Sequence, residues 1–327
     1  MDMMKLAEEI IAGRRLGRED DLSVLVHCDL KALAQGADQI RRHLLGEKVD
    51  LCTIINGRSG HCPEDCKYCA QSVHHATGCA AHDLLEKEVI VQEARQNEEE
   101  GVDRFAIVTS GMGFTPADFD QLLAAYQSIR TACHHLKLCG SHGFLTREQF
   151  RRLRQAGVSR YHENIETSRR FFPSICTTHT YDDKIRSIRM AQEEGLSVCS
   201  GGIIGMGETW EDRLDMAVSL SELGIESIPI NALMPISGTP LEALPQLPQE
   251  DILRTVAIFR YLNPEANIRL AAGRALIDHD GEAAFAGGAS AAITGNMLTT
   301  SGSTIQSDRA MLQAMGRRLA APVPKEK

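Results

Sequence analysis

The chain has 327 residues, a hydrophobic fraction of 43% and a formal net charge of −9 at pH 7. It is long enough to bury a large core as one α/β barrel, and its acidic balance argues against a nucleic-acid or anionic-membrane surface. It has no apolar run of about 18 residues and no signal-peptide pattern near its start, so we expect a cytoplasmic protein.

The elements predicted along the chain begin with a helical extension over residues 1–45. After it, one pattern recurs: a charged helical run, a glycine, and a short β-branched run, as in "NEEEGVDRFAIVTSG" and "AQEEGLSVCSGGIIG". A glycine that ends a helix just before a strand is typical of the αβ half of a βαβ unit. Strands are predicted at Val49–Ile55, Arg104–Thr109, Leu136–Gly140, Arg160–Ile165, Ser197–Ile204, Ser227–Leu233, Asn267–Ala271 and Ala291–Gly295.

Segments with helical periodicity separate these strands, at Lys87–Glu100, Pro116–Cys133, Thr146–Ala156, Tyr181–Glu194, Thr209–Leu223, Gln249–Leu262 and Gly281–Ala286. The alternation predicts an α/β fold, a (β/α)8 barrel over residues 46–315, and a disordered tail over 316–327. An open doubly wound sheet is the alternative that the pattern leaves open.

In such a barrel, chemistry belongs at the C-terminal ends of the strands. The residues that could bind a ligand or take part in catalysis fall there: a cysteine run after the first strand, then Ser110, Cys139, Asn164, Glu166, Cys199, Asn231, Arg269, Thr299 and Thr300. We therefore expect one functional mouth.

The chain has ten cysteines, which in a reducing compartment are buried thiols, metal ligands or catalytic thiols rather than disulfides. Cys28, Cys52 and Cys133 stand singly in apolar or helical contexts, and we interpret them as packing residues. The run "SGHCPEDCKYCAQS" is different, because it places three cysteines in a C-x3-C-x2-C spacing.

Three thiolates suit a [4Fe–4S] cluster in which one iron keeps a free position. Structural zinc prefers four closed ligands; His61 could be the fourth, but it adjoins Cys62 and no second pair has the right spacing. With Tyr68 just before the last cysteine, the run resembles the cluster loop of the radical S-adenosylmethionine superfamily. That resemblance implies that Cys62, Cys66 and Cys69 hold the cluster, whose open iron binds S-adenosylmethionine.

Further motifs resemble the biotin synthase family: "YHENIETSRRFF", "VCSGGIIGMGET", "SIPINALMPISGTPL", "IRLAAGR" and "NMLTTSG". The resemblance spans residues 45–315 and implies sulfur insertion into dethiobiotin, a flavodoxin or ferredoxin electron donor, and a homodimer. Two alternatives remain open. One is another radical S-adenosylmethionine enzyme with this barrel, such as a mutase or a hydrogenase maturase. The other is a non-catalytic iron–sulfur or zinc protein.

The family resemblance also implies roles for single residues. It assigns S-adenosylmethionine contacts to Tyr68, Ser110, Gly111, Asn164, Glu166 and Ile203, the last within the pattern of Gly201, Gly205 and Glu208. It assigns substrate contacts to Asn164, Asn231, Thr299 and Thr300. Asn and Thr at strand ends are also common turn and cap residues, and Glu166 could merely pair with Arg169 or Arg170.

An auxiliary [2Fe–2S] cluster that donates the sulfur is usual in this family, held by three cysteines and one arginine. Cys139, Cys199 and Arg269 match three of those positions, but the fourth is Ala106, which cannot bind iron. Cys176 is our first candidate for a substitute ligand and Cys79 our second. A cluster of different nuclearity, or no auxiliary cluster, would also explain Ala106. Arg269 could instead pair with a carboxylate such as Glu166.

Overall fold

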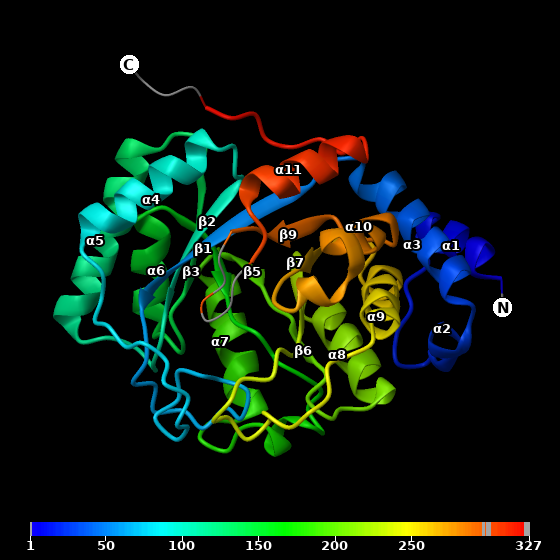
Figure 1. Cartoon of the computed structure of the whole chain (residues 1–327), viewed down its shortest axis with the longest axis horizontal. Helices are drawn as coiled ribbons and strands as arrows, with labels where there is room; N and C mark the ends of the chain where they lie inside the picture. Colours follow the sequence, from blue (N-terminus) through cyan, green and yellow to red (C-terminus); the bar gives the residue numbers. More distant parts are fainter. Residues whose placement is uncertain (1, 296–297, 299–301, 324–327) are drawn as a thin grey trace.

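The protein folds as a closed barrel of parallel strands surrounded by helices (Figure 1), in a computed structural model that describes residues 2–295, 298 and 302–323. Among these residues, nine strand segments form one sheet whose order closes on itself through an added pairing between β5 and β7. The segments are β1 Asp50–Arg58, β2 Arg104–Thr109, β3 Lys137–Ser141, β4 Val158–His162, β5 Ser197–Cys199, β6 Gly202–Ile204, β7 Ser227–Ala232, β8 Asn267–Leu270 and β9 Ala291–Ile293.

The segments β5 and β6 are two halves of one barrel strand. Cys199 pairs with Ser227 and Gly202 pairs with Ile230, so the register against β7 is the same on both sides of the break. Opposite the break stands Pro229, which has no N–H to donate to the ladder. The barrel therefore has eight strands across the described residues, as the sequence predicts, and the alternative of an open doubly wound sheet is wrong.

Helices cover the outside of the barrel, as Figure 1 shows. Three of them begin with a capping box, at Thr146, Thr180 and Thr209. In each, the threonine side chain accepts the backbone N–H of the third helical residue, and the side chain of that residue accepts the backbone N–H of the threonine. Each cap stabilises its helix by about 1 kcal/mol. The outer helices are α4 Lys87–Glu99, α5 Pro116–Ala132, α6 Arg147–Gln155, α7 Tyr181–Glu193, α8 Trp210–Glu222, α9 Gln249–Leu262, α10 Asp278–Ala286 and α11 Ile305–Ala314.

The N-terminal extension consists of α1 Met3–Ile11, α2 Ser23–His27 and α3 Leu30–Leu45. It packs beside α9, where the buried Tyr261 hydroxyl donates to the Met3 carbonyl at 2.9 Å. At the same end of the barrel, Arg318 N–H donates to the Glu47 carbonyl, and buried Arg317 donates to the Phe285 carbonyl at 2.6 Å. The expected tail therefore starts later than residue 316, because these two arginines are part of the packed structure.

The predicted strands overlap the observed ones, and their ends differ by a few residues. The largest differences are at β1, which continues to Arg58 instead of Ile55, and at β4, which leaves the ladder at His162 instead of Ile165. Just beyond it, Glu166 adopts a left-handed φ of 69°, which a regular strand does not allow. No helix in the described part of the chain is long and apolar enough to cross a membrane.

The glycine at the break between β5 and β6 permits a close approach that no other residue would allow. A Cβ on Gly201 would lie 1.9 Å from the Pro229 carbonyl oxygen. We expect Gly201→Ala to reduce the free energy of unfolding by about 1–3 kcal/mol through overpacking, measured by urea unfolding. Gly17→Ala is the matched control, since nothing lies within 4 Å of its Cβ position. Equal stability of both variants would contradict this tight packing.

Candidate active site in the barrel interior

A cavity of about 300 Å³ lies inside the barrel, and inward-facing side chains from every strand line it. Its floor is rich in thiols and guanidinium groups, and its upper wall is formed by amides, a carboxylate and apolar side chains. The residues used below are Cys52, Tyr68, Arg104, Ala106, Cys139, Arg160, His162, Asn164, Glu166, Cys199, Ile203, Ser227, Asn231 and Arg269. Eight of the residues predicted for the site thus share one chamber.

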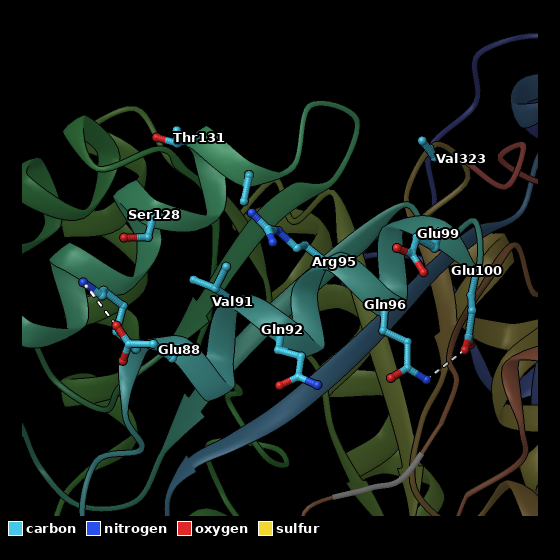
Figure 2. Close-up of a pocket in the computed structure, with 12 residues that line it drawn as sticks. Glu88, Val91, Gln92, Arg95, Gln96, Glu99, Glu100, Ser128, Thr131 and Val323 are labelled. Atoms are coloured by element: carbon cyan, nitrogen blue, oxygen red, sulfur yellow. Dashed lines mark hydrogen bonds and ion pairs between the residues drawn. The ribbon is translucent and has the colours of Figure 1, made fainter. Parts of the chain in front are cut away.

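A larger groove of about 1090 Å³ lies elsewhere, on the outer faces of α4 and α5 (Figure 2). Charged and amide side chains line it, including Glu88, Gln92 and Arg95. It contains none of the residues that the sequence predicts for the site. Size alone is therefore a poor guide to the active site of this protein.

The three-cysteine loop follows β1 and is folded back on itself by backbone hydrogen bonds. Cys69 N–H donates to the Cys66 carbonyl at 2.9 Å, and Cys62 N–H donates to the Gln71 carbonyl at 3.0 Å. All three cysteines are partly buried. Burial raises the pKa of the Cys69 thiol to about 11, and the nearby Cys62 also raises it. The sequence thus places three cysteines on one short, internally bonded loop.

The segment after β4 holds this loop from the other side. Asp65 accepts the Thr177 N–H at 2.8 Å, and Lys67 N–H donates to the Ile175 carbonyl at 2.9 Å. Cys176 lies here, with its Sγ 3.8 Å from that of Cys66. The thiol of Cys66 donates to Cys176, which lowers the pKa of Cys176 to about 4 despite partial burial.

Cys66, Cys176 and His179 place their ligand atoms within 4.8 Å of one another. Cys176 therefore belongs to the rim around the three-cysteine loop, and it does not line the inner chamber. Cys79 also lies outside the chamber, with its Sγ 3.9 Å from the Ser59 hydroxyl. The two cysteines that we expected to replace the missing ligand at Ala106 are thus in the wrong place for that role. His61 is exposed and makes no described contact with the loop's thiols.

Asn164 and Glu166 form the rim between the loop and the chamber. Asn164 Oδ1 accepts the Gly201 N–H at 3.0 Å, and its Nδ2 lies 3.3 Å from Glu166 Oε2. Burial raises the pKa of Glu166, although the Lys184 charge and a hydrogen bond with Tyr68 lower it. The expected partners of Glu166 are engaged elsewhere, because Arg169 pairs with Asp182 and Arg170 with Asp212.

The backbone of Glu166 is also part of this rim. Its N–H donates to the Gly201 carbonyl at 3.1 Å, and its carbonyl accepts the Ile203 N–H at 2.9 Å. These bonds explain the glycine run, since a Cβ on Gly202 would lie 2.2 Å from the Glu166 carbonyl oxygen. Further along, Glu208 accepts the backbone N–H groups of Gly205 and Met206. The glycine run therefore has a structural role in this rim, and its predicted contact with S-adenosylmethionine stays a prediction.

Ser110 and Gly111 follow β2 and lie next to the three-cysteine loop. The Ser110 hydroxyl donates to the Gly60 carbonyl at 2.7 Å, and the Arg58 guanidinium donates to the Ser110 carbonyl at 3.0 Å. Gly111 has a φ of 89°, a conformation that favours glycine. These two residues therefore adjoin the three-cysteine loop at the end of β2.

Asn231 lies on β7 with both ends of its amide bonded to the backbone. Its Nδ2 donates to the Gly202 carbonyl and its Oδ1 accepts the Ala272 N–H, each at 3.1 Å. It lines the chamber and also ties three segments of its wall together. Thr299 and Thr300, the other predicted substrate contacts, lie outside the described residues.

The floor of the chamber carries the predicted auxiliary ligands. Cys139, Cys199 and Arg269 are each buried and line it together. Arg269 does pair with a carboxylate, but the partner is Asp50 at 2.5 Å and not Glu166. Burial raises the pKa of Asp50, but the charges of Arg269 and Arg104 outweigh burial and hold this pKa well below its usual range. Likewise, burial raises the pKa of Cys199, but a hydrogen bond with His162 lowers it to about 7.

Sequence reasoning missed several residues of this floor, namely Asp50, Cys52, Arg104, Arg160 and Ser227. The interpretation of Cys52 as a packing residue is incomplete, because its side chain faces the chamber next to Cys139 and Ala106. Alternation along the predicted strand at 49–55 could have found it, since residues of one strand face the same side at every second position.

The chamber suits an anionic group held by thiolates. Arg160 Nη1 is buried and has no hydrogen-bond partner among the described residues, a costly state unless something else accepts its proton. Arg104 Nη1 lies 3.9 Å from Cys139 Sγ. Thiolates are the usual ligands of iron–sulfur clusters, and the surrounding guanidinium groups would compensate such a cluster's negative charge.

Two family models and several solved structures are similar to this chain. Residues 58–220 match the model of the radical SAM superfamily, and residues 229–318 match that of the biotin and thiamin synthesis associated domain. Among solved structures, methylornithine synthase superposes with a TM-score of 0.83 at 18% identity, covering 97% of this chain and 98% of that one. The [FeFe]-hydrogenase maturase gives a TM-score of 0.81, also at 18% identity, covering 97% of this chain and 75% of that one. At these identities the likeness shows the fold alone.

Curated relatives go further. A biotin synthase of Clostridium beijerinckii is 58% identical over 96% of this chain and 99% of its own length. A biotin synthase of Alkaliphilus metalliredigens is 56% identical over 98% of this chain and all of its own length. With identities this high over nearly the whole chain, the protein belongs to the biotin synthase family of radical S-adenosylmethionine enzymes.

Proposed function

We propose that the chamber is where this enzyme converts dethiobiotin to biotin, with the three-cysteine loop above it and the thiol-rich floor below it. The cofactors of the family supply the chemistry: a [4Fe–4S] cluster with S-adenosylmethionine provides the radical, and an auxiliary iron–sulfur cluster provides the sulfur. Unactivated C–H bonds cannot be opened by acid–base groups, so the chain's own residues bind, orient and shield.

One observation carries the proposal: the three-cysteine loop reaches the chamber through Tyr68, and a second group of cysteines lines the chamber inside the barrel. Cys62, Cys66 and Cys69 are on a loop beyond the strand ends, whereas Cys139 and Cys199 are inside the barrel. The rim residues Asn164 and Glu166 lie between them. A substrate held at the rim would have one group of cysteines on each side, as the transfer of sulfur to a carbon-centred site requires.

The residues that would hold these groups are those that the family resemblance assigns. Cys62, Cys66 and Cys69 would hold the radical cluster, and Tyr68, Ser110, Gly111, Glu166 and Ile203 surround the space beside it for S-adenosylmethionine. Asn164 and Asn231 offer amides to the substrate's ureido ring, and Thr299 and Thr300 would bind its carboxylate end.

Asn164 is held in place before any ligand arrives. Its Oδ1 is fixed by the Gly201 N–H, so the amide plane cannot turn freely. A fixed hydrogen-bonding group loses little entropy when the ligand binds, and correct placement of the reacting carbon depends on such groups. The left-handed backbone at Glu166 serves the same end, since it directs that side chain toward Tyr68.

Three further features belong to this proposal. An external one-electron donor, a flavodoxin or ferredoxin, would dock near the cluster loop, where Val73 is 57% exposed. The enzyme would act as a homodimer in the cytoplasm. Residues 46–315 would form the catalytic barrel unit, with residues 1–45 as a helical extension packed against it.

The decisive assay is anaerobic. Reconstituted protein is mixed with S-adenosylmethionine, dethiobiotin and a reductant, and 5′-deoxyadenosine and biotin are quantified together. We expect both products. Deoxyadenosine without biotin would show that the substrate or the auxiliary site is misassigned, and the absence of both from protein that holds iron would overturn the proposal.

Replacing Cys66 by alanine should remove both activities, because it deletes one of the three thiols on the loop. We expect each product to fall by at least about 100-fold, more than the loss of a residue that only supports a ligand. The control is Cys133→Ala, a buried cysteine at the end of α5 and outside the chamber. A Cys66→Ala variant that still cleaves S-adenosylmethionine would disprove the cluster assignment.

Replacing Cys139 by alanine should separate the two activities. Biotin formation is expected to fall by at least about 100-fold, whereas 5′-deoxyadenosine still forms, because the three-cysteine loop is untouched. Both products are measured in one reaction against the Cys133→Ala control. Simultaneous loss of both products from a folded variant would contradict the division of the chamber into two sites.

A further inference from the structure

The barrel register aligns four polar or thiol side chains in one layer. Small parallel barrels fill their interior with layers of four side chains, each layer contributed by alternate strands. Cys52, Cys139, Cys199 and Arg269 come from the first, third, fifth and seventh barrel strands, β1, β3, β5 and β8. All four line the chamber.

The register shows that these residues are level with one another. Strands of such a barrel are staggered by one residue at each step, for a shear of eight. Cys52 on β1 pairs with Arg104 on β2, and one residue further along β2 is Phe105. Phe105 pairs with Leu138 on β3, and one residue further along β3 is Cys139, which is therefore level with Cys52. The same one-residue shift at each strand leads from Cys139 through β4 to Cys199 on β5. It then reaches Arg269 through β7 and returns to Cys52 through β9.

Ala106 belongs to the neighbouring layer. It pairs directly with Cys139 and packs against both Cys139 and Cys52 in one small cluster. Its methyl group is 5% exposed, and the cysteine of usual family members would stand at this position. The chain therefore lacks one thiol in the even-strand layer and has an extra one in the odd-strand layer, next to it.

Contacts among the thiols support a shared ligand role. The side chains of Cys52 and Cys139 pack against each other in one small buried cluster. Cys199 lies 3.5 Å from the Ser227 hydroxyl, and the same hydroxyl is 3.3 Å from Arg269 Nε. Cys176 and Cys79 lack any such connection to this floor. Of the described cysteines, Cys52 is thus the one placed to complete the set.

We infer that Cys52 is the third thiolate ligand of the auxiliary iron–sulfur cluster, in place of the thiol missing at position 106. The inference rests on the proposed function, since it assumes that Cys139 and Cys199 hold such a cluster. It also implies that the ligands lie in one layer with Arg269 instead of being divided between two layers. The guanidinium of Arg269 is fixed by Asp50 and by the Ala292 carbonyl at 2.8 Å.

The test uses the full chain without its radical cluster, so that any bound iron reports the auxiliary site. Cys62, Cys66 and Cys69 are all replaced by alanine, and the protein is reconstituted anaerobically with iron and sulfide. Iron, acid-labile sulfide and the visible absorption spectrum are measured. In this background we expect Cys52→Ala to lower bound iron and sulfide by at least about tenfold, and Cys133→Ala to leave both unchanged.

The outcomes separate the two claims. If the background itself binds no iron, the auxiliary site of the proposed function fails, and the assignment of Cys52 fails with it. If the background binds iron and Cys52→Ala binds as much with the same spectrum, the assignment of Cys52 alone is overturned. If Cys52→Ala does not fold, as judged by circular dichroism, Cys52→Ser decides. A folded serine variant with lost iron or a shifted spectrum supports the inference, and an unchanged one overturns it.

Discussion

The ion pair between Asp50 and Arg269 is the interaction on which the interior of this barrel depends. Asp50 also accepts from Arg104 at 3.0 Å, so one carboxylate fixes two guanidinium groups from different strands. Buried charges are tolerated only when they are paired and hydrogen-bonded. Asp50 is shared by Arg104 and Arg269, and Arg160 pairs with Glu226 at 3.6 Å, so three guanidinium groups have two carboxylates between them. The floor therefore retains positive charge, which thiolates and a cluster that they bind would neutralise. The same charge lowers the pKa of Cys199, although the hydrogen bond from His162 lowers it more.

Above this charged floor the chamber extends toward the loops at the strand ends, where Tyr68 lines it. Interior side chains such as Cys139 are fixed by the sheet, whereas the three-cysteine loop is held by local hydrogen bonds and by the segment after β4. Placing one group of thiols on rigid strands and the other on a loop keeps them apart, with Asn164 between. The strand break opposite Pro229 adds to this arrangement, because it frees backbone groups near Gly201 to bind that amide.

The sequence was sufficient to predict the fold and part of the chamber, because glycine-ended helices and β-branched runs depend on local chemistry. It was also sufficient to place Cys139, Cys199 and Arg269 together, since they end or lie on predicted strands. What it did not predict depends on register. Cys52 looked like a packing residue because its neighbours are apolar, and only closure of the barrel places it level with Cys139. Cys176 looked available for the floor, but the loop after β4 carries it to Cys66 instead.

Register also explains how a family can lose a ligand position and keep its site. Inside a barrel, Ala106 and Cys52 are neighbours in space although they lie on different strands and in different layers. A thiol on β1 at position 52 faces Cys139, as a thiol on β2 at position 106 would. The ion pair between Asp50 and Arg269 does not depend on which of the two positions carries the sulfur. The ligand set is then a property of the enclosed space and its charge, rather than of any one sequence position. A search for the usual position alone would therefore miss a site that the geometry of the barrel preserves.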